Sequence, residues 1–248
     1  KKEHELRSKV KGALVYPSVV VAAMIGIGIL MMIMVVPKLT AVFEELKIEL
    51  PLSTRIIIGF SKGLQNNLIF LAIGLAALIF LARTLLKNKK IKTGLDWLIL
   101  HLPIFSGISK KINIARIART MGSLIDGGIP IIKGLEITQD TLSNSFFKNS
   151  LDACAKQVQK GNPLSSALLE YKFIYPPMVT QMIQVGEETG TLSDILKRLA
   201  DFYEEEVSTI AKSLSSVIEP VLMIIVGAAV AFFAISMVQP MYTMMEAI

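Results

Sequence analysis

The sequence predicts an all-α membrane protein with three transmembrane helices and a cytoplasmic six-helix bundle. Its composition is typical of an integral membrane protein, since 52% of the 248 residues are apolar and the mean hydropathy is +0.57. Three apolar runs are long enough to cross the roughly 30 Å hydrocarbon core of a bilayer. Between residues 109 and 219 the apolar residues recur at helical spacing, and no run alternates as a strand would.

Two of the apolar runs are copies of one another. Pro17 and Pro37 bound the first, Pro220 and Pro240 bound the other, and the same interval separates both pairs of matching prolines. This placement indicates a tandem repeat of a soluble part followed by a membrane span. The soluble part of the first copy is not in the sequence. We therefore expect the natural protein to continue upstream, with residues 1–15 as the tail of a missing first cytoplasmic domain.

The predicted orientation follows from the lysines and arginines that flank the spans, because these residues accumulate on the cytoplasmic side. They precede the first span and follow the second, whereas the last eight residues contain none. The N-terminus is therefore expected in the cytoplasm and the C-terminus outside it. The expected segments are span 16–36, short extracytoplasmic segment 37–67, span 68–86, interfacial linker helix 87–108, cytoplasmic bundle 109–216, span 217–238 and extracytoplasmic tail 239–248.

The formal net charge of +6 has the same origin as the predicted orientation. Basic residues beside the spans direct insertion and attract the anionic lipids of the cytoplasmic leaflet. We therefore expect anionic lipid as a partner of this chain, and we do not expect nucleic acid.

Turn signals divide the predicted bundle into six helices. Gly127, Gly128 and Pro130 separate the first helix from the second, because glycine permits a left-handed stop and proline fits a first turn. Asn144 is expected to cap the third helix, and Gly161 is expected to close it. The expected helices are 109–126, 130–142, 145–160, a short one after Pro163, one that opens at 176–177, and one from about 191 that continues into the third span.

A further helix is expected ahead of the bundle. Residues 91–102 carry leucine and isoleucine at helical spacing, with Trp97 and His101 alongside, before Pro103 interrupts the pattern. This arrangement is typical of a helix that lies in the membrane interface. We interpret His101 as an interface residue rather than a ligand, because the only other histidine is His4.

The sequence contains few patterns that are typical of catalytic or cofactor-binding sites. No Gly-x-x-x-x-Gly-Lys-Ser/Thr phosphate loop is present. Two histidines and one cysteine do not form a clustered metal set, and Cys154 is interpreted as a small core residue. No ionisable residue lies in the middle of a span, which disfavours a proton or ion path. We therefore expect no catalytic, cofactor-binding or metal-binding residues.

Two acidic features are candidates for interaction. Glu187 lies between Gly186 and Gly190, and we interpret it as a structural residue that bonds donors at the corner between the fifth and sixth helices. A direct contact with a partner is the alternative, ahead of a catalytic acid–base role. The acidic run 204–206 is interpreted as a solvated helix face, with a basic partner as the alternative.

The same corner carries a recognisable motif: Gly-Glu, two residues, Gly, one residue, Leu. It falls on Gly186, Glu187, Gly190 and Leu192. Further matches are the helix break Gly127-Gly128-Ile129-Pro130, the segment that begins Gly161-Asn162-Pro163, and the span openings at Pro17 and Pro220. In this order, and over essentially the whole chain, they make the protein similar to the F-protein family of type II secretion systems. That family includes the inner-membrane platform proteins of type IV pilus machines.

The resemblance implies two cytoplasmic six-helix bundles and three spans, in the order bundle, span, span, bundle, span. It also implies a non-enzymatic platform in the inner membrane. Such a platform couples a hexameric secretion or pilus ATPase to the extraction and polymerisation of pilin or pseudopilin subunits, together with other inner-membrane assembly proteins. A homo-oligomer is expected, because a platform sits on a symmetric motor axis. Whether the machine secretes proteins or assembles pili stays open.

Two other functions remain as alternatives. A membrane permease subunit driven by a separate ATPase requires polar groups at mid-membrane, and the spans offer almost none. A membrane-anchored receptor requires a ligand-binding exterior domain, for which the segment 37–67 is short.

Overall fold

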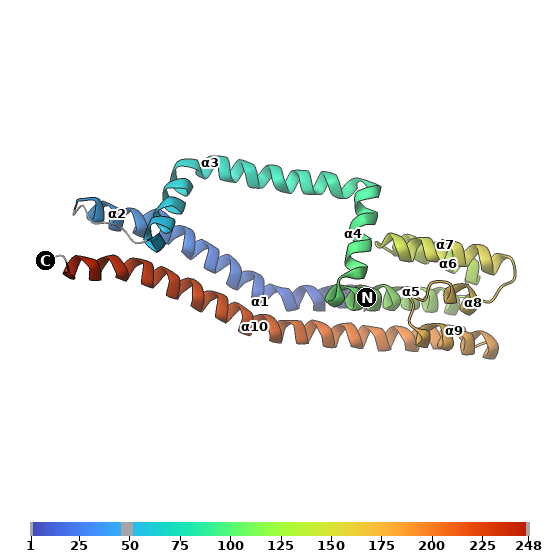
Figure 1. The fold of residues 1–248 in the computed structure, drawn as a ribbon. Coiled ribbons are helices and arrows are strands. Elements are labelled where there is room, and N and C mark those ends of the chain that lie inside the picture. Colours follow the sequence, from blue (N-terminus) through green and yellow to red (C-terminus); the bar gives the residue numbers. More distant parts are fainter. Residues whose placement is uncertain (1, 46–51, 247–248) are drawn as a thin grey trace. The chain divides into compact units, whose positions relative to one another are not determined.

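The protein is helical wherever the structure describes regular elements. The structure, a computed structural model, describes residues 2–45 and 52–246, and the all-α prediction is confirmed for this part of the chain. Figure 1 labels the helices in chain order. The chain divides into two compact units: unit 1 consists of Lys1–Val10 and Arg83–Lys212, and unit 2 consists of Lys11–Ala82 and Ser213–Ile248.

Unit 1 holds a series of short helices followed by the first part of a long one. Its main helices are α4 Lys89–His101, α5 Pro103–Asp126, α6 Ile131–Thr141, α7 Ser145–Gln159, α8 Leu164–Leu169, α9 Pro177–Thr189 and the first part of α10 Leu192–Glu246. The helix predicted to begin at residue 109 begins at Pro103. Proline fits the first turn of α5, where its missing N–H leaves no helical hydrogen bond unmade.

The capping prediction for α7 is confirmed. Asn144 has extended backbone geometry, and its side-chain oxygen accepts a hydrogen bond of 3.0 Å from the N–H of Phe146. An asparagine in this position satisfies one of the donors that the first turn of a helix leaves free. The start of α7 is therefore set by a local signal in the sequence.

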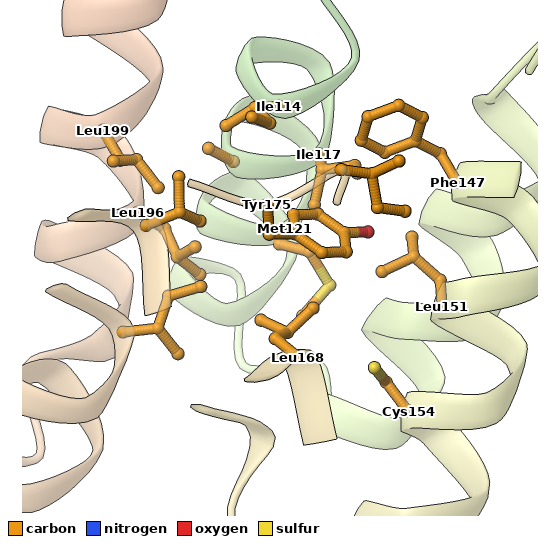
Figure 2. Packing of buried hydrophobic residues seen from close by; sticks show 14 of the residues in the cluster. Ile114, Ile117, Met121, Phe147, Leu151, Cys154, Leu168, Tyr175, Leu196 and Leu199 are labelled. Atoms are coloured by element: carbon orange, nitrogen blue, oxygen red, sulfur yellow. The ribbon is translucent and has the colours of Figure 1, made fainter. Parts of the chain in front are cut away.

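One cluster of buried apolar side chains forms the core of unit 1, with members from every helix between α4 and α10. Figure 2 shows Leu196 and Leu199 of α10 on one side of the Tyr175 ring, and Leu151 and Cys154 of α7 on the other. The ring of Tyr175 meets that of Phe147 edge to face at 5.5 Å between centroids. Its hydroxyl lies 2.8 Å from the hydroxyl of Ser150, so the buried phenol has a polar partner.

Helix α4 packs on this core through one side only. Leu100 is 1% exposed, and a carboxylate oxygen of Asp96 accepts hydrogen bonds from the backbone N–H and the hydroxyl of Ser145, at 2.8 and 2.7 Å. Trp97 and Leu98 are exposed on the remaining surface of the helix. The linker helix predicted within 87–108 is thus attached to unit 1. Its contact with a membrane interface stays a prediction.

Unit 2 contains the long apolar helices. Helix α1, Lys2–Leu30, is followed by the π-helical turn η1, Met31–Val35, and then by α2, Val36–Glu45. Helix α3, Leu52–Lys87, has non-helical backbone at Asn67, with φ −124° and ψ 20°. This break falls where the span 68–86 is predicted to begin.

The predicted extracytoplasmic segment 37–67 is helical where the structure describes it. It consists of α2 and the first part of α3. Residues 46–51 of this segment, and residues 247–248 of the predicted tail 239–248, lie outside the described residues.

Two stretches of the described residues are long and apolar enough to cross a membrane, Val15–Lys38 and Leu192–Val238. Few of their side chains are buried, which distinguishes them from the core helices of a soluble domain. They contain the predicted spans 16–36 and 217–238. The predicted span 68–86 lies within α3, many of whose side chains are outside the described residues, and it stays a prediction.

Pro17 and Pro220 mark the starts of apolar runs but not the starts of helices. Pro17 lies inside α1, and Pro220 lies inside α10, which begins at Leu192. A long helix tolerates such a proline where neighbouring groups satisfy the freed carbonyl. The repeat therefore marks changes of composition along continuous helices.

Candidate functional site

The family motif predicted from the sequence lies at the corner between α9 and α10, here called the motif corner, Gly186 to Leu192. Gly186 is buried at a close approach between the two helices. A Cβ atom added to it would lie 3.0 Å from the Cα of Leu192 and 3.2 Å from a side-chain carbon of Ile195. Only glycine fits this position without a shift of backbone, because one of the neighbouring atoms belongs to the main chain.

Gly190 ends α9 in the left-handed conformation, with φ 69°. The N–H of Thr191 donates to the carbonyl of Gly186 at 2.9 Å, and the N–H of Gly190 donates to that of Glu187 at 3.4 Å. This pair of bonds is the Schellman pattern, which satisfies the last carbonyls of a helix. The turn then leads directly into Leu192, the first residue of α10.

Glu187 bonds donors at a different place from the one predicted. Its two carboxylate oxygens accept hydrogen bonds from the N–H groups of Leu164 and Ser165, at 2.5 and 3.0 Å, in the first turn of α8. Pro163, which precedes this turn, provides no side-chain acceptor, and Asn162 donates instead to the side chain of Gln157. Glu187 therefore replaces a local cap and connects α9 to α8.

Pro17 and Pro220 lie inside α1 and α10, and the other motif residues lie at helix ends or in turns. Gly127 is the C-cap of α5, Gly128 follows with φ 78°, and Pro130 is the N-cap of α6. Gly161, with φ 91°, lies in the turn between α7 and α8. The structure brings Glu187 and the turn after Gly161 together at the start of α8, whereas the Gly127–Pro130 break belongs to a separate turn.

A second set of contacts joins α5 to α10. The guanidinium of Arg119 pairs with the carboxylates of Asp201 and Glu204, the latter at 2.8 Å. Lys111 pairs with Glu206 at 2.5 Å, and hydrogen bonding to Glu204 is the largest of the effects that raise the pKa of Arg119. Two of the three carboxylates in the acidic run 204–206 therefore bind cations of their own chain. The interpretation of the run as a solvated face is wrong for Glu204, whose side chain is 15% exposed, whereas that of Glu206 is 40% exposed.

Sequence reasoning also missed Gly122 of α5. A Cβ atom on Gly122 would lie 3.2 Å from the Cβ of Leu196 and 3.2 Å from the backbone nitrogen of Lys197. Lys197 in turn pairs with Asp126 at 2.7 Å. A glycine inside a helical pattern is the one signal that could have indicated a close approach to another helix.

Aromatic rings gather where α4 meets the loop between α8 and α9. The rings of Trp97 and His101 stack at 4.0 Å between centroids, and those of His101 and Phe173 at 5.0 Å. The ammonium of Lys110 lies 4.1 Å from the centre of the Phe173 ring, and burial lowers the pKa of Lys110. His101 thus bridges two aromatic residues, which is a packing role.

The groups with catalytic potential are engaged in packing. Cys154 is buried, and burial raises the pKa of its thiol to about 12, which keeps it protonated. Ser61 stands in a Gly-x-Ser-x-Gly pattern, Gly59 to Gly63, but it lies inside helix α3 rather than on a strand-to-helix turn, and its hydroxyl donates to the carbonyl of Met32. Among the described residues, no group of three or more histidine, cysteine, aspartate or glutamate side chains lies close enough together to hold a metal ion.

The comparison with known proteins agrees with the motif. Residues 117–240, which include the motif corner, match the family described as Type II secretion system (T2SS), protein F. The chain belongs to this family. The resemblance predicted from the motifs is therefore confirmed.

Relatives named for type IV pilus assembly and relatives named for type II secretion both align with the chain. The Type IV pilus assembly protein PilC of Thermus thermophilus is 35% identical over 241 residues, which are 97% of this chain and 59% of the relative. PilC of Myxococcus xanthus is 33% identical over 247 residues, 100% of this chain and 59% of the relative. The Type II secretion system protein F of Vibrio cholerae is 32% identical over 240 residues, 97% of this chain and 59% of the relative. The chain thus spans 59% of the length of each of these three relatives.

Proposed function

We propose that the chain is the larger part of an inner-membrane platform protein of a type II secretion or type IV pilus machine. One observation carries this proposal: the chain aligns over nearly its whole length with relatives named for pilus assembly and for type II secretion. The two long apolar helices and the helical unit 1 fit such a role. In the proposed role the chain performs no chemistry of its own and acts by holding other proteins.

In the proposed architecture, helices α5 to α10 of unit 1 form a cytoplasmic six-helix bundle that docks a hexameric assembly ATPase. The chain crosses the membrane at 16–36, 68–86 and 217–238, with the N-terminus in the cytoplasm and the C-terminus outside. The basic residues beside the first two spans support this orientation. Other inner-membrane assembly proteins are expected beside the spans.

The proposed mechanism passes motion from the ATPase to pilin or pseudopilin subunits through α10. This helix begins at the motif corner in unit 1 and includes the third predicted span in unit 2. Bending a helix sharply breaks backbone hydrogen bonds, so a continuous α10 transmits a rotation or displacement of the bundle to the membrane. The subunits are then extracted from the bilayer and polymerised at the moving span.

Anionic lipid is the proposed partner of α4. Trp97 is 51% exposed and Leu98 is 46% exposed, while Asp96 and Leu100 face the core of unit 1. Exposed tryptophan with leucine beside basic residues favours the headgroup region of a bilayer. The exposed Lys92 at the start of this helix adds attraction to anionic headgroups.

A homo-oligomer is also part of the proposal. Gly26 and Gly28 in the first apolar helix, and Gly227 in α10, have nothing within 4 Å of the position of an added Cβ. Small residues at an uncovered helix surface allow a second helix to approach closely in a membrane. Packing between the two related spans of one chain is the alternative use of these glycines.

Purification of the full-length protein with its natural partners tests the proposed function. An affinity-tagged protein is extracted from crosslinked native membranes, and its partners are identified by mass spectrometry. We expect a hexameric secretion ATPase and pilin-like subunits. If neither partner is recovered and the reconstituted protein conducts solute into vesicles, the platform is rejected and the permease subunit is favoured.

A further inference from the structure

The two repeated prolines at the far ends of the apolar runs each leave one backbone carbonyl without its helical donor. A proline has no N–H, so it cannot bond the carbonyl one turn earlier in its helix. In α10, where the residues around Pro240 are α-helical, this carbonyl belongs to Ser236, four residues earlier. Where such a carbonyl is shielded from water, it needs a substitute donor.

In the first repeat the carbonyl concerned lies five residues before the proline, one more than in the second, because the helix there includes a wider, π-helical turn. In η1, Met31–Val35, the N–H of Val36 donates to the carbonyl of Met31, five residues earlier. Continued by one residue, this register would pair Pro37 with the carbonyl of Met32, and proline has no N–H to donate. A single π-helical turn of this kind is a common way to accommodate a local break in the hydrogen-bond ladder.

Side chains of one helix bond both of these carbonyls. The hydroxyl of Thr54 donates to the carbonyl of Ser236 at 2.7 Å. The hydroxyl of Ser61 donates to the carbonyl of Met32 at 2.5 Å, and the amide of Gln65 donates to the same oxygen at 3.3 Å. All three donors belong to the first part of α3.

These donors share one face of α3. Thr54, Ser61 and Gln65 are spaced seven and four residues apart, which places them along one side of a helix. Thr54 is 1% exposed, Ser61 is 2% exposed, and Ile57 between them is 2% exposed. This set, Thr54, Ser61 and Gln65, is called the α3 polar face below. Thr54 and Ser61 are therefore shielded from competition by water, whereas Gln65 is exposed.

We propose that the α3 polar face joins the two repeat-related spans by supplying the hydrogen bonds that Pro37 and Pro240 cannot make. The prolines free one carbonyl in each copy of the repeat, and the segment between the first two predicted spans bonds both. The first part of α3 is then an internal connector within unit 2. This inference concerns the stability of unit 2 and does not depend on the proposed platform function.

The test is a double-mutant cycle between a donor and the proline that makes it necessary. The full-length protein in detergent carries Thr54→Val, Pro240→Ala, both changes, or Thr54→Ser, and thermal unfolding is followed by circular dichroism. Thr54→Val keeps the size of the side chain but removes the donor, and we expect the unfolding midpoint to fall by on the order of 2 °C. Pro240→Ala restores a backbone N–H for Ser236, so the double variant is expected to regain the parental midpoint. Thr54→Ser retains the hydroxyl and is expected to unfold like the parent.

Thr40→Val is the matched control. Thr40 is also buried, and its hydroxyl bonds a carbonyl of its own helix, that of Val36, at 2.8 Å. Any loss of stability in this variant is not expected to be restored by Pro240→Ala. A Thr54→Val variant with the parental midpoint, or a double variant as unstable as Thr54→Val alone, would overturn the proposal.

Discussion

At the residue scale, Glu187 and Gly186 attach the corner between α9 and α10 to its neighbours. Glu187 accepts two hydrogen bonds from the first turn of α8, and Gly186 lets α10 approach α9 at backbone distance. Neither residue needs a reactive group for this role. The motif therefore specifies the geometry from which α10 starts.

Glu187→Ala is expected to lower the free energy of unfolding by about 1–2 kcal/mol, because two N–H groups of α8 lose their acceptor. Urea denaturation followed by circular dichroism measures the change. Glu188→Ala is the control, since exposed Glu188 contacts only Gln184 of its own helix among the hydrogen bonds seen for it. An equal loss in both variants would contradict the role of Glu187 as a cap.

Gly186→Ala is expected to destabilise the protein by about 1–3 kcal/mol, because the added Cβ meets backbone of Leu192. The control is Gly94→Ala in α4, where an added Cβ has nothing within 4 Å and alanine favours the helix. The two variants are compared by their denaturation midpoints. If Gly186→Ala were as stable as Gly94→Ala, the close approach would not constrain the corner.

Cys154 provides a pH-dependent test of the core. Burial raises the pKa of its thiol to about 12, above the value of roughly 8.5 for an unfolded chain. Because the folded protein holds the thiol proton more tightly than the unfolded chain does, the thiol contributes fully to the free energy of unfolding below the pKa of the unfolded chain. This contribution is lost as the pH rises toward 12. Iodoacetamide at pH 9 is therefore expected to alkylate the folded protein far more slowly than the urea-unfolded protein, as measured by mass spectrometry. Equal rates in the two states would place the thiol outside the core.

At the element scale, ion pairs and a close glycine contact hold α5 against the first part of α10. Arg119 lies between Asp201 and Glu204, and Gly122 admits Leu196 and Lys197 one turn further along. These contacts fix the side of α10 that faces the bundle. They also remove Glu204 from the surface available to a partner, because its side chain is only 15% exposed.

Arg119→Ala is expected to cost about 1–2 kcal/mol of stability, because it leaves the half-buried Glu204 without its cation. The control is Arg198→Ala, a change on the exposed surface of α10, for which we expect less than about 0.5 kcal/mol. Urea denaturation at low and high salt compares the variants. Equal stability of the two variants would show that the α5–α10 ion pairs are dispensable.

The sequence predicts contacts between residues that are close together in the chain and misses contacts between residues that are far apart in it. Asn144 caps α7 as expected, because its partner is two residues away. Glu187 was assigned to the wrong donors, since Leu164 and Ser165 lie more than twenty residues earlier in the chain. The pairing of Arg119 with Glu204 crosses 85 residues and leaves no periodic signal. The predicted start of α5 at residue 109 is wrong because Pro103, which ends the preceding helical pattern, also forms the first turn of α5.

At the scale of the whole molecule, α10 has residues in both units, as α1 and α3 also do. It runs from Leu192 to Glu246, so the motif corner and the third predicted span belong to one helix. The repeat and the composition predict this arrangement, because periodic apolar residues continue from the acidic face into the uncharged run. Contacts between distant segments, such as those of the α3 polar face, carry no such pattern.

Insertion of a flexible Gly-Ser segment next to Ser215 tests most directly whether the protein transmits motion through α10. The insertion is made in the full-length protein of the natural host, and pilus assembly or protein secretion is measured. An equal insertion in the segment 46–51, which does not belong to α10, is the control. We expect the first insertion to abolish assembly while the protein remains in the membrane at its normal level, and the control to retain activity. Normal assembly with the insertion next to Ser215 would contradict the account.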